Sequence, residues 1–356
     1  MAALGFASAR LAAVPQSEPA SAAPIQVKVV IVAMYEKGEG MAGPPGEFQT
    51  WVDKERLDRV WAFPQGERAL RTNKEGSVLG VVTGVGTIHS AATIMALGTD
   101  PRFDLRRAYW LVAGIAGVNP HAASLGSAAW AEWVVDGDLG HEIDAREMPP
   151  EWPTGHFPLR KKAPYELPVD PQEGQVFHLV PAFVDWAYRL TADTPLPDSE
   201  GLRRHRILYS GYPEALRPPF VLKGDNLAAM NFWHGRLMND WATAWVSYHT
   251  GGAGRYVTSA MEDTGTLQSL AWLARSGRVD ARRALVLRTA SNYDMPWPGA
   301  TASQSLAGEG LAAGYSGYFP ALDAAYRVGS RVLHALLDGW KVYEERIPGD
   351  PPRTTG

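Results

Sequence analysis

The chain has 356 residues, a formal net charge of −4 at pH 7 and no cysteine. Its length is enough to bury a large core. Lys and Arg are scattered along the chain, which argues against a nucleic-acid partner. The longest apolar runs have about half of the ~20 residues that a membrane-spanning helix needs, which argues against membrane insertion. The lack of cysteine excludes disulfides, zinc thiolates and catalytic thiols.

The two ends of the chain differ in composition from the rest. Residues 1–25 are rich in Ala, Ser and Pro, and their small-residue end resembles the cleavage region of a secretory signal, although Arg10 interrupts a thin apolar stretch. We expect either an export signal, which would place the protein in the periplasm or outside the cell, or a disordered tail on a cytoplasmic protein. Residues 348–356 have the composition of a second disordered tail. One domain is expected over residues 26–347.

Buried-strand patterns alternate with glycine turns and helical spacing in the first half of the chain. Four apolar runs of the kind found in strands of a parallel sheet are Val27–Met34, Val78–Thr83, Tyr109–Ala113 and Ala128–Val135. A glycine turn at residues 84–86 leads into a helix predicted over Ile88–Leu97. We interpret residues 114–117 (GIAG) as a second glycine turn. This alternation predicts an α/β fold.

The second half continues the pattern after a polar excursion. Residues 136–172 are rich in Pro, Gly and charge and are expected to run over the surface, where they could cover a site. The elements predicted after it are helices over Val176–Leu190, Leu227–Tyr248, Thr264–Ala274 and Tyr318–Tyr343, and a buried strand over Ala284–Thr289. The last helix should pack along the sheet, because six apolar positions share one face. These positions are Leu322, Ala325, Val328, Val332, Leu336 and Trp340.

Three glycine-rich segments are candidate ligand loops. The spacing in residues 38–43 (GEGMAG) is that of a dinucleotide-binding fingerprint, but three residues separate it from the preceding strand and two prolines follow, so we do not expect a Rossmann site. In residues 83–86 (TGVG), two nearby glycines let the backbone approach a ligand at a helix N-terminus. A plain connecting turn is the alternative for this segment and for residues 114–117. The glycine-loop candidates are Thr83, Gly84, Gly86, Gly114 and Gly117.

Five short motifs follow one another along the chain. They are residues 32–36 (VAMYE), 83–86 (TGVG), 114–117 (GIAG), 261–262 (ME) and 288–292 (RTASN). As a set they resemble the nucleoside phosphorylase and nucleosidase superfamily. Within it, residues 232–235 (FWHG), 261–266 (MEDTGT) and 288–294 (RTASNYD) resemble the family of purine nucleoside permeases, or nucleoside uptake proteins, over about residues 26–345. The resemblance implies a single-domain, three-layer α/β fold with a central mixed sheet flanked by helices, and a homo-oligomer with a dimer as its smallest form.

The same resemblance implies a nucleoside pocket. Met261 and Glu262 would hold the ribose, since a carboxylate can accept hydrogen bonds from two neighbouring hydroxyls. Ser291 would contact the purine, and Asp225 lies in a Lys-Gly-Asp stretch that resembles one found before the base pocket. Aromatic rings that could stack on a purine are Phe232, Trp233 and Tyr256.

Asn292 stands where the superfamily often has an aspartate. An amide donates a hydrogen bond but cannot deliver a proton, so Asn292 would only stabilise charge on the leaving base, which favours inosine or guanosine. Asp294 is the candidate acid if its loop turns it inward, and a turn-forming residue otherwise.

The choice of nucleophile depends on residues that are missing. Phosphorylases of the superfamily hold phosphate with arginines and a hydroxyl, but residues 36–43 contain no arginine, and Val112 and Ile115 stand at the other two positions. Water activated by Glu36 is therefore expected, with Glu39 as the reserve base. His89 and the N–H groups of residues 84–87 could still hold inorganic phosphate as a co-substrate.

No other cofactor is expected, and no metal, because the histidines near these motifs lack the spacing of a metal site. These histidines are His89, His121 and His234. The expected reaction is cleavage of the N-glycosidic bond of a purine nucleoside, by hydrolysis to free base and ribose. The alternatives are a phosphate-dependent phosphorylase and a non-catalytic nucleoside-binding component of nucleoside uptake.

Overall fold

A computed structural model describes residues 23–36, 45–309 and 317–350 of the chain. Three predicted segments lie wholly or partly outside this described part: residues 1–22 of the signal or tail predicted over 1–25, the glycine-rich segment 38–43 with Glu39, and residues 351–356 of the second predicted tail.

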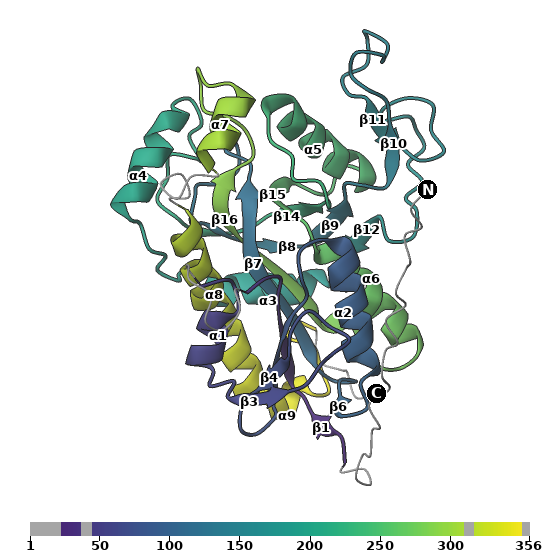
Figure 1. Ribbon diagram of the computed structural model, residues 1–356, viewed down its shortest axis with the longest axis vertical. Helices are drawn as coiled ribbons and strands as arrows, with labels where there is room; N and C mark the ends of the chain where they lie inside the picture. Colours follow the sequence, from purple (N-terminus) through teal and green to yellow (C-terminus); the bar gives the residue numbers. More distant parts are fainter. Residues whose placement is uncertain (1–22, 37–44, 310–316, 351–356) are drawn as a thin grey trace, which may run out of the picture.

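A mixed sheet of twelve strands forms the centre of the molecule (Figure 1). Its two longest strands, β7 (Tyr109–Val118) and β16 (Ala284–Tyr293), run parallel side by side. The first half of β7 also pairs with β2 (Val29–Ala33), and from there the sheet continues through β5 (Val78–Val82), β4 (Leu70–Thr72) and β3 (Arg59–Trp61).

The second half of β7 has a different neighbour. It pairs with β15 (Tyr256–Ala260), which leads to β14 (Asp225–Ala228), β9 (Trp133–Asp136) and β12 (Val176–His178). On its other side, β16 pairs with β8 (Ala128–Ala131), and β8 with β13 (Val221–Lys223). Only Glu132 separates β8 from β9, and only Gly224 separates β13 from β14. The strand pairings therefore form a closed ring that runs from the second half of β7 through β15, β14, β9, β8 and β16 back to β7.

Helices cover the sheet on both sides of β7, as Figure 1 shows. α8 (Tyr318–Asp338) packs along β7 and β16, with α1 (Gln49–Lys54) and α3 (Pro181–Thr191) beside it. Across the sheet, α2 (Thr87–Thr99) and α6 (Asp263–Arg275) pack together, and α5 (Arg236–His249) covers β14 and β15. These layers confirm the predicted α/β fold with a central mixed sheet flanked by helices.

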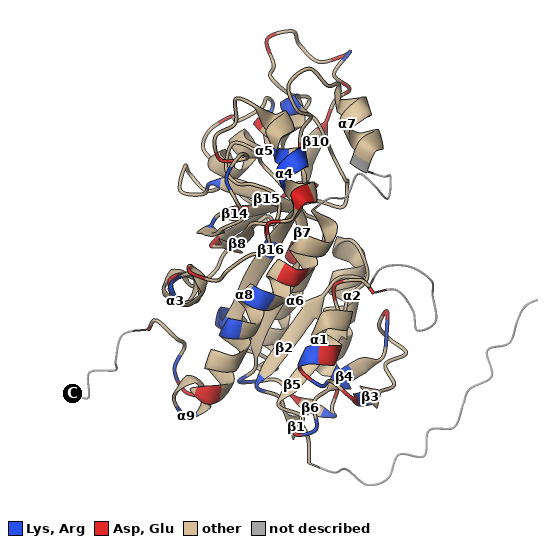
Figure 2. Cartoon of the chain, turned by 90° about the vertical axis from the view of Figure 1, so that its left-hand side faces the viewer, with Lys and Arg blue, Asp and Glu red and all other residues tan. Residues whose placement is uncertain are grey.

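Smaller elements lie towards the two ends of the molecule, as Figures 1 and 2 show. At the lower end β1 (Ile25–Gln26) pairs with β6 (Phe103–Asp104), near α9 (Trp340–Tyr343). At the upper end lie α4 (Glu200–Arg206), α7 (Ala302–Glu309) and the hairpin of β10 (Gly140–Glu142) with β11 (His156–Pro158). Short 3₁₀ turns occupy Ile207–Tyr209 and Ala281–Arg283. None of the helices in the described residues is long and apolar enough to cross a membrane.

Most predicted buried elements are confirmed. The apolar runs beginning at Val27, Val78 and Ala284 form β2, β5 and β16, and helices predicted near Ile88 and Thr264 form α2 and α6. The run at residues 128–135 forms two strands, β8 and β9, rather than one. All six apolar positions of the last helix are buried, although the helix ends at Asp338 and a short α9 follows.

Three predicted elements are wrong in type or extent. Residues 114–117 are not a turn: β7 runs straight through them, and their glycines leave room for side chains from neighbouring segments. The helix predicted from Val176 begins at Pro181, because residues 176–178 pair with β9 as strand β12. The helix predicted from Leu227 begins at Arg236, because residues 225–228 pair as strand β14 and Gly235 adopts a φ of 146° that breaks the helix.

Candidate functional site

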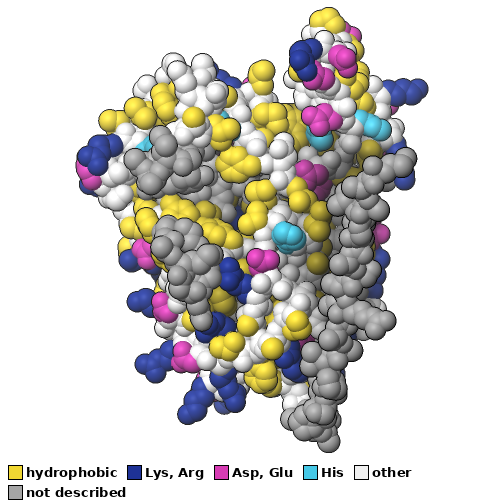
Figure 3. Space-filling model, in the orientation of Figure 1, with side chains coloured by type: hydrophobic (Ala, Val, Ile, Leu, Met, Phe, Trp, Pro, Cys, Tyr) yellow, Lys and Arg dark blue, Asp and Glu magenta, His cyan; other side chains and the backbone are white. Residues whose placement is uncertain are grey.

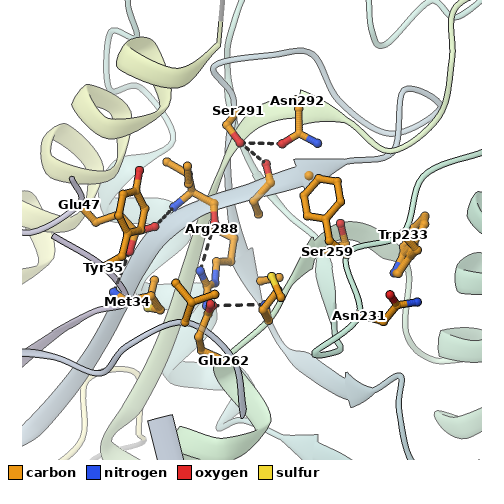
Figure 4. Close-up of a pocket in the computed structure, with 17 residues that line it drawn as sticks. Met34, Tyr35, Glu47, Asn231, Trp233, Ser259, Glu262, Arg288, Ser291 and Asn292 are labelled. Carbon is orange, nitrogen blue, oxygen red and sulfur yellow. Dashed lines mark hydrogen bonds and ion pairs between the residues drawn. The ribbon is translucent and has the colours of Figure 1, made fainter. Parts of the chain in front are cut away.

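A pocket opens where the parallel strands β2, β5, β7 and β16 end and where β15 meets β7 (Figure 4). Ligands of α/β proteins commonly bind at this edge, because chain segments diverge where the strands stop. The described residues that line it are Met34, Tyr35, Glu47, Val85, Ile115, Ala116, Gly117, Asn231, Phe232, Trp233, Ser259, Ala260, Met261, Glu262, Arg288, Ser291 and Asn292.

Glu47 brings a buried carboxylate to one end of the pocket. Its Oε2 accepts a 2.7 Å hydrogen bond from Met34 N–H and its Oε1 a 2.7 Å bond from Ile115 N–H. Gly114 makes this approach possible, since a Cβ there would lie 2.5 Å from Oε1. Burial raises the pKa of Glu47 from 4.5 to about 7, although Arg288 and the two amides lower it in part. The carboxyl group is therefore poised to exchange a proton near neutral pH.

Arg288 lies at the centre of the pocket and is almost fully buried. Its Nε and Nη2 donate to Asp263 at 3.1 and 2.8 Å, Nη2 also donates to Glu262 at 3.1 Å, and Nη1 donates to the Ile115 carbonyl at 3.1 Å. Burial would lower the pKa of Arg288, but the charges of Asp263, Glu262 and Glu47 together raise it. The guanidinium is thus a fixed positive charge that four of its five N–H groups tie to the protein.

Glu262 faces the pocket between Arg288 and the glycine loop after β5. Its Oε1 accepts a 3.3 Å bond from Gly86 N–H and its Oε2 a 3.3 Å bond from Met261 N–H. Burial raises its pKa, and the charge of Arg288 lowers it. On the loop, Val85 lines the pocket. The predicted glycine turn at residues 84–86 therefore positions the carboxylate of Glu262, through the backbone N–H of Gly86.

The opposite end of the pocket carries neutral polar groups. Gly117 on β7 pairs with Ser259 on one side and with Asn292 on the other, so both side chains reach this end (Figure 4). The Ser291 hydroxyl shares its single proton between the Ala116 carbonyl at 3.1 Å and Asn292 Oδ1 at 2.8 Å. Because its oxygen is occupied, Asn292 presents its amide N–H₂ as the group available to a ligand.

Apolar side chains form the rest of the wall and the rim. Trp233 is buried in the wall, whereas Phe232 and Val85 line the pocket and are each 48% exposed. Met230 lies next to the glycine loop, since a Cβ at Gly86 would lie 3.0 Å from Met230 Cε. Figure 3 shows the side of the molecule that faces the viewer in Figure 1. Apolar side chains gather in the middle of this side, and most charged side chains lie towards its edges. A flat apolar ligand group would find aromatic surface here.

Glu36, the predicted base, does not line the described pocket. Its carboxylate accepts hydrogen bonds from the N–H groups of Gly46 at 2.7 Å, Phe48 at 3.1 Å and Gln49 at 2.7 Å. The Phe48 and Gln49 amides lie at the start of α1, and Gly46 lies in the loop before it, so the carboxylate closes this loop and satisfies two N–H groups at the helix start.

Two predicted base-binding residues also lie outside the pocket lining. The carboxylate of Asp225 accepts from the backbone N–H groups of Glu132, Trp133 and Arg255 and joins β14 to its neighbours. Tyr256 is buried behind Ser259, with its hydroxyl on Asp294 rather than its ring on the cavity.

The remaining predicted residues divide in the same way. Of the catalytic candidates, Asn292 lines the pocket, and Asp294 is buried one layer behind it, hydrogen-bonded to Ser259 Oγ at 2.8 Å. Met261, Glu262, Phe232, Trp233, Ser291 and Gly117 line the pocket, whereas Thr83, Gly84, Gly86, Gly114 and His89 do not. His89 is exposed on α2 and packs over Gly84.

Five polar side chains of the lining had no predicted role: Tyr35, Glu47, Asn231, Ser259 and Arg288. Arg288 left a signal in the sequence, because a charge inside the apolar run ALVLRT needs a buried partner. Glu47 left no such signal in the sequence, because its position beside β7 depends on the path that the chain takes after β2. Among the described residues, no group of three or more acidic or histidine side chains could hold a metal ion.

The family described as purine nucleoside permease matches residues 26–348. A probable purine nucleoside permease of Schizosaccharomyces pombe is 29% identical over 291 residues, which cover 79% of this chain and 80% of the relative. A purine nucleoside permease of Candida albicans is 29% identical over 269 residues, 74% of this chain and 65% of the relative. The matched region is thus slightly less than two thirds of the Candida protein.

Solved structures with the same fold include a hydrolase and a nucleosidase. Futalosine hydrolase of Helicobacter pylori gives a TM-score of 0.52 at 12% identity, covering 88% of this chain and 99% of that one. The 5'-methylthioadenosine/S-adenosylhomocysteine nucleosidase of Helicobacter pylori gives 0.51 at 14% identity, covering 88% and 99%. At such identities the likeness shows the fold alone, and it agrees with the fold expected from the sequence motifs.

Proposed function

The chain belongs to the purine nucleoside permease family, and we propose that it hydrolyses the N-glycosidic bond of purine nucleosides in the pocket at the ends of β2, β7, β15 and β16. One observation carries the proposal. Glu47 places a buried carboxylate, with a pKa raised to about 7, on the same pocket as Glu262. A base that works near neutral pH needs a pKa of this kind.

The two carboxylates divide the work on the sugar. Glu262 accepts hydrogen bonds from the ribose hydroxyls, because its carboxylate lines the pocket and can accept from several donors. Glu47 takes a proton from a water molecule as the oxygen attacks the anomeric carbon. The sugar develops positive charge as the bond to the base breaks, and the negative charge at this end of the pocket stabilises that transition state.

Water is the nucleophile we propose, because the pocket is poorly suited to phosphate. Arg288 is the sole Lys or Arg among the described lining residues, and its donors are engaged by Glu262, Asp263 and Ile115. A phosphate dianion would have to compete for this guanidinium and approach both Glu47 and Glu262. A neutral water molecule has neither cost.

The purine is assigned to the other end of the pocket. Trp233 and Phe232 offer aromatic surface to the ring, and the Asn292 amide can donate to one of its nitrogens. The names of the yeast relatives refer to purine nucleosides, which agrees with this assignment.

Inosine, incubated with the pure protein in the presence and absence of phosphate, tests the reaction. We expect free ribose and hypoxanthine without phosphate, and a fall in kcat of roughly 10²- to 10⁴-fold in Glu47→Gln, the range typical of general bases. Glu75→Gln, which changes an exposed carboxylate, is the matched control and should retain the wild-type rate. Formation of ribose-1-phosphate would replace hydrolysis by phosphorolysis, and no turnover of any purine nucleoside would overturn both.

A non-catalytic nucleoside-binding component of nucleoside uptake is the second candidate. It is favoured by the permease names of the relatives and by Asn292, which cannot act as an acid. This function predicts tight binding of inosine in a calorimeter, with no release of hypoxanthine and no change in affinity between wild type and Glu47→Gln. Release of hypoxanthine that depends on Glu47 would exclude it.

A further inference from the structure

The leaving purine needs a proton that Asn292 cannot give. As the bond to the sugar breaks, its electron pair goes to the base, and protonation of a ring nitrogen makes the base a better leaving group. At the purine end of the described pocket, hydroxyl donors come from Ser259 and Ser291. The Ser291 hydroxyl faces the Ala116 carbonyl and Asn292 Oδ1, neither of which can supply a proton, whereas the Ser259 hydroxyl faces the carboxyl group of Asp294, which can.

Ser259 connects the pocket to a buried carboxyl group. Its Oγ lies 2.8 Å from Oδ1 of Asp294, and the Tyr256 hydroxyl donates to Oδ2 of the same carboxyl. Asp294 is only 1% exposed and does not line the pocket, so the serine is its described contact with that cavity. A Cβ at position 117 would lie 1.9 Å from Asp294 Oδ1 and 2.6 Å from Ser259 Oγ. Glycine at this position therefore makes room for the pair.

We propose that Ser259 donates the proton to the departing purine and that Asp294, acting through Ser259, supplies it. As the C1'–N9 bond breaks, the Ser259 Oγ proton moves to N7 of the purine, and the Asp294 carboxylic proton moves to Oγ. The base leaves neutral, and Asp294 becomes a carboxylate that accepts hydrogen bonds from Tyr256 and Ser259. Solvent restores its proton after the products leave, while Glu47 releases the proton it took from water. This inference rests on the proposed hydrolysis and assigns its proton donor.

The surroundings of Asp294 suit a group that carries a proton near neutral pH. Burial raises the pKa of Asp294 to about 7, and the hydrogen bonds from Tyr256 and Ser259 lower it in part. Tyr256 on β15 stays protonated, because burial and Asp294 raise its pKa further. In the loop before α5, His234 is neutral, since burial lowers its pKa to about 4, and the neighbouring Gly235 N–H donates to the backbone carbonyl of Asp294.

The test compares inosine with 7-methylinosine over pH 5 to 9. The methyl group at N7 makes the base cationic, so it leaves without receiving a proton there. On inosine, kcat/KM should rise as Glu47 ionises and fall as Asp294 loses its proton. Ser259→Ala and Asp294→Asn should lower kcat/KM for inosine by about 10²-fold or more and abolish the falling limb, while changing 7-methylinosine hydrolysis by less than about threefold.

Two controls separate this relay from a structural role. Tyr256→Phe keeps both members of the relay but removes a hydrogen bond that lowers the pKa of Asp294, so the falling limb should remain and move to higher pH. Glu47→Gln should slow both substrates, because each reaction needs an attacking water. Equal losses on both substrates in Ser259→Ala and Asp294→Asn would overturn the relay.

The pH profile on inosine decides by itself if wild type does not accept 7-methylinosine. Persistence of the falling limb in Asp294→Asn then overturns the relay, and its loss supports it. Failure of the proposed function looks different, because wild type would then release no hypoxanthine at any pH.

Discussion

The two ends of the pocket hold their carboxyl groups in opposite ways. At the β2 end, Glu47 and Glu262 face the cavity and share the charge of Arg288. At the β15 end, Asp294 is withdrawn behind Ser259, and its carboxyl contacts the hydroxyls of Ser259 and Tyr256.

Burial raises the pKa of both Glu47 and Asp294 to about 7. The two groups therefore differ in what they touch rather than in how strongly they hold a proton. One can receive a proton directly from water in the pocket, and the other can exchange with a ligand through a hydroxyl. Variants that disturb one end at a time test whether this difference is real.

Removal of Arg288 should have the largest effect, because it leaves its buried ion-pair partners Glu262 and Asp263 without their cation. Arg288→Met is expected to lower the free energy of unfolding by about 3 to 5 kcal/mol, the usual cost of an unpaired buried charge, and to abolish hydrolysis. Urea denaturation and an inosine assay on the folded fraction measure both.

Arg283→Met is the matched control, since Arg283 is as buried as Arg288 but binds Asp280 and backbone carbonyls away from the pocket. It should lose stability and keep its activity when folded. If the folded Arg283→Met control were inactive, loss of activity in Arg288→Met could not be assigned to the position of Arg288 in the pocket.

Ionisation of Glu47 should make the wild-type protein less stable as pH rises. Its pKa is raised from 4.5 to about 7 in the folded state, so folding favours the protonated form, and stability is lost as pH increases from the unfolded value through the folded one. Each pKa unit corresponds to ~1.4 kcal/mol, so the loss is roughly 2 to 3 kcal/mol between pH 5 and 8.

Glu47→Gln removes the contribution of this carboxyl group to the pH dependence. The free energy of unfolding of the variant, relative to wild type, should therefore increase by the same roughly 2 to 3 kcal/mol between pH 5 and 8. Asp294→Asn should behave alike, because burial raises the pKa of Asp294 in the same way. Urea denaturation at several pH values measures the slopes, with Glu75→Gln as a control that follows wild type. Parallel curves for wild type and Glu47→Gln would show that this carboxyl titrates normally in the folded protein.

Added methyl groups on β7 should disturb one end of the pocket at a time. In Gly114→Ala the new Cβ would lie 1.9 Å from Met34 Cε and 2.5 Å from Glu47 Oε1, and in Gly117→Ala 1.9 Å from Asp294 Oδ1. We expect each variant to lose about 1 to 3 kcal/mol of stability through overpacking.

Their kinetics should differ. Gly114→Ala should slow inosine and 7-methylinosine alike, whereas Gly117→Ala should slow inosine more. Gly308→Ala is the control, because in α7 the added methyl would have no atom of the described residues within 4 Å beyond its own helix. An identical pattern for the two β7 variants would remove the distinction between the ends.

Periodicity in the sequence predicted the parts of the fold that local patterns determine. Continuous β-branched runs became β2 and β5, and the apolar stripe of the last helix became the buried face of α8. Glycine misled in β7, because a residue without a side chain serves a turn and a crowded strand equally well, and only the neighbours of Gly114 and Gly117 decide between them.

The sequence likewise located residues of the pocket lining where a motif identifies them, and pointed to residues outside the lining where their position depends on tertiary neighbours. Motif resemblance placed Glu262, Asn292 and Trp233, and all three line the pocket. Resemblance also pointed to Asp225, and the stacking ability of aromatic rings pointed to Tyr256. The polar groups of both are satisfied within the protein, a property that depends on tertiary contacts and leaves no trace in local sequence.

Glu36 should give the smallest effect, although its place directly after β2 makes it the base that the sequence favours. Its carboxylate caps the start of α1, so Glu36→Gln should cost about 0.5 to 2 kcal/mol of stability, as the loss of a helix cap does. In the folded variant kcat/KM for inosine should stay within about threefold of wild type, because the carboxylate does not reach the reacting atoms. A loss as large as that of Glu47→Gln would return the role of base to Glu36 and leave Glu47 as a buried group that only supports β7.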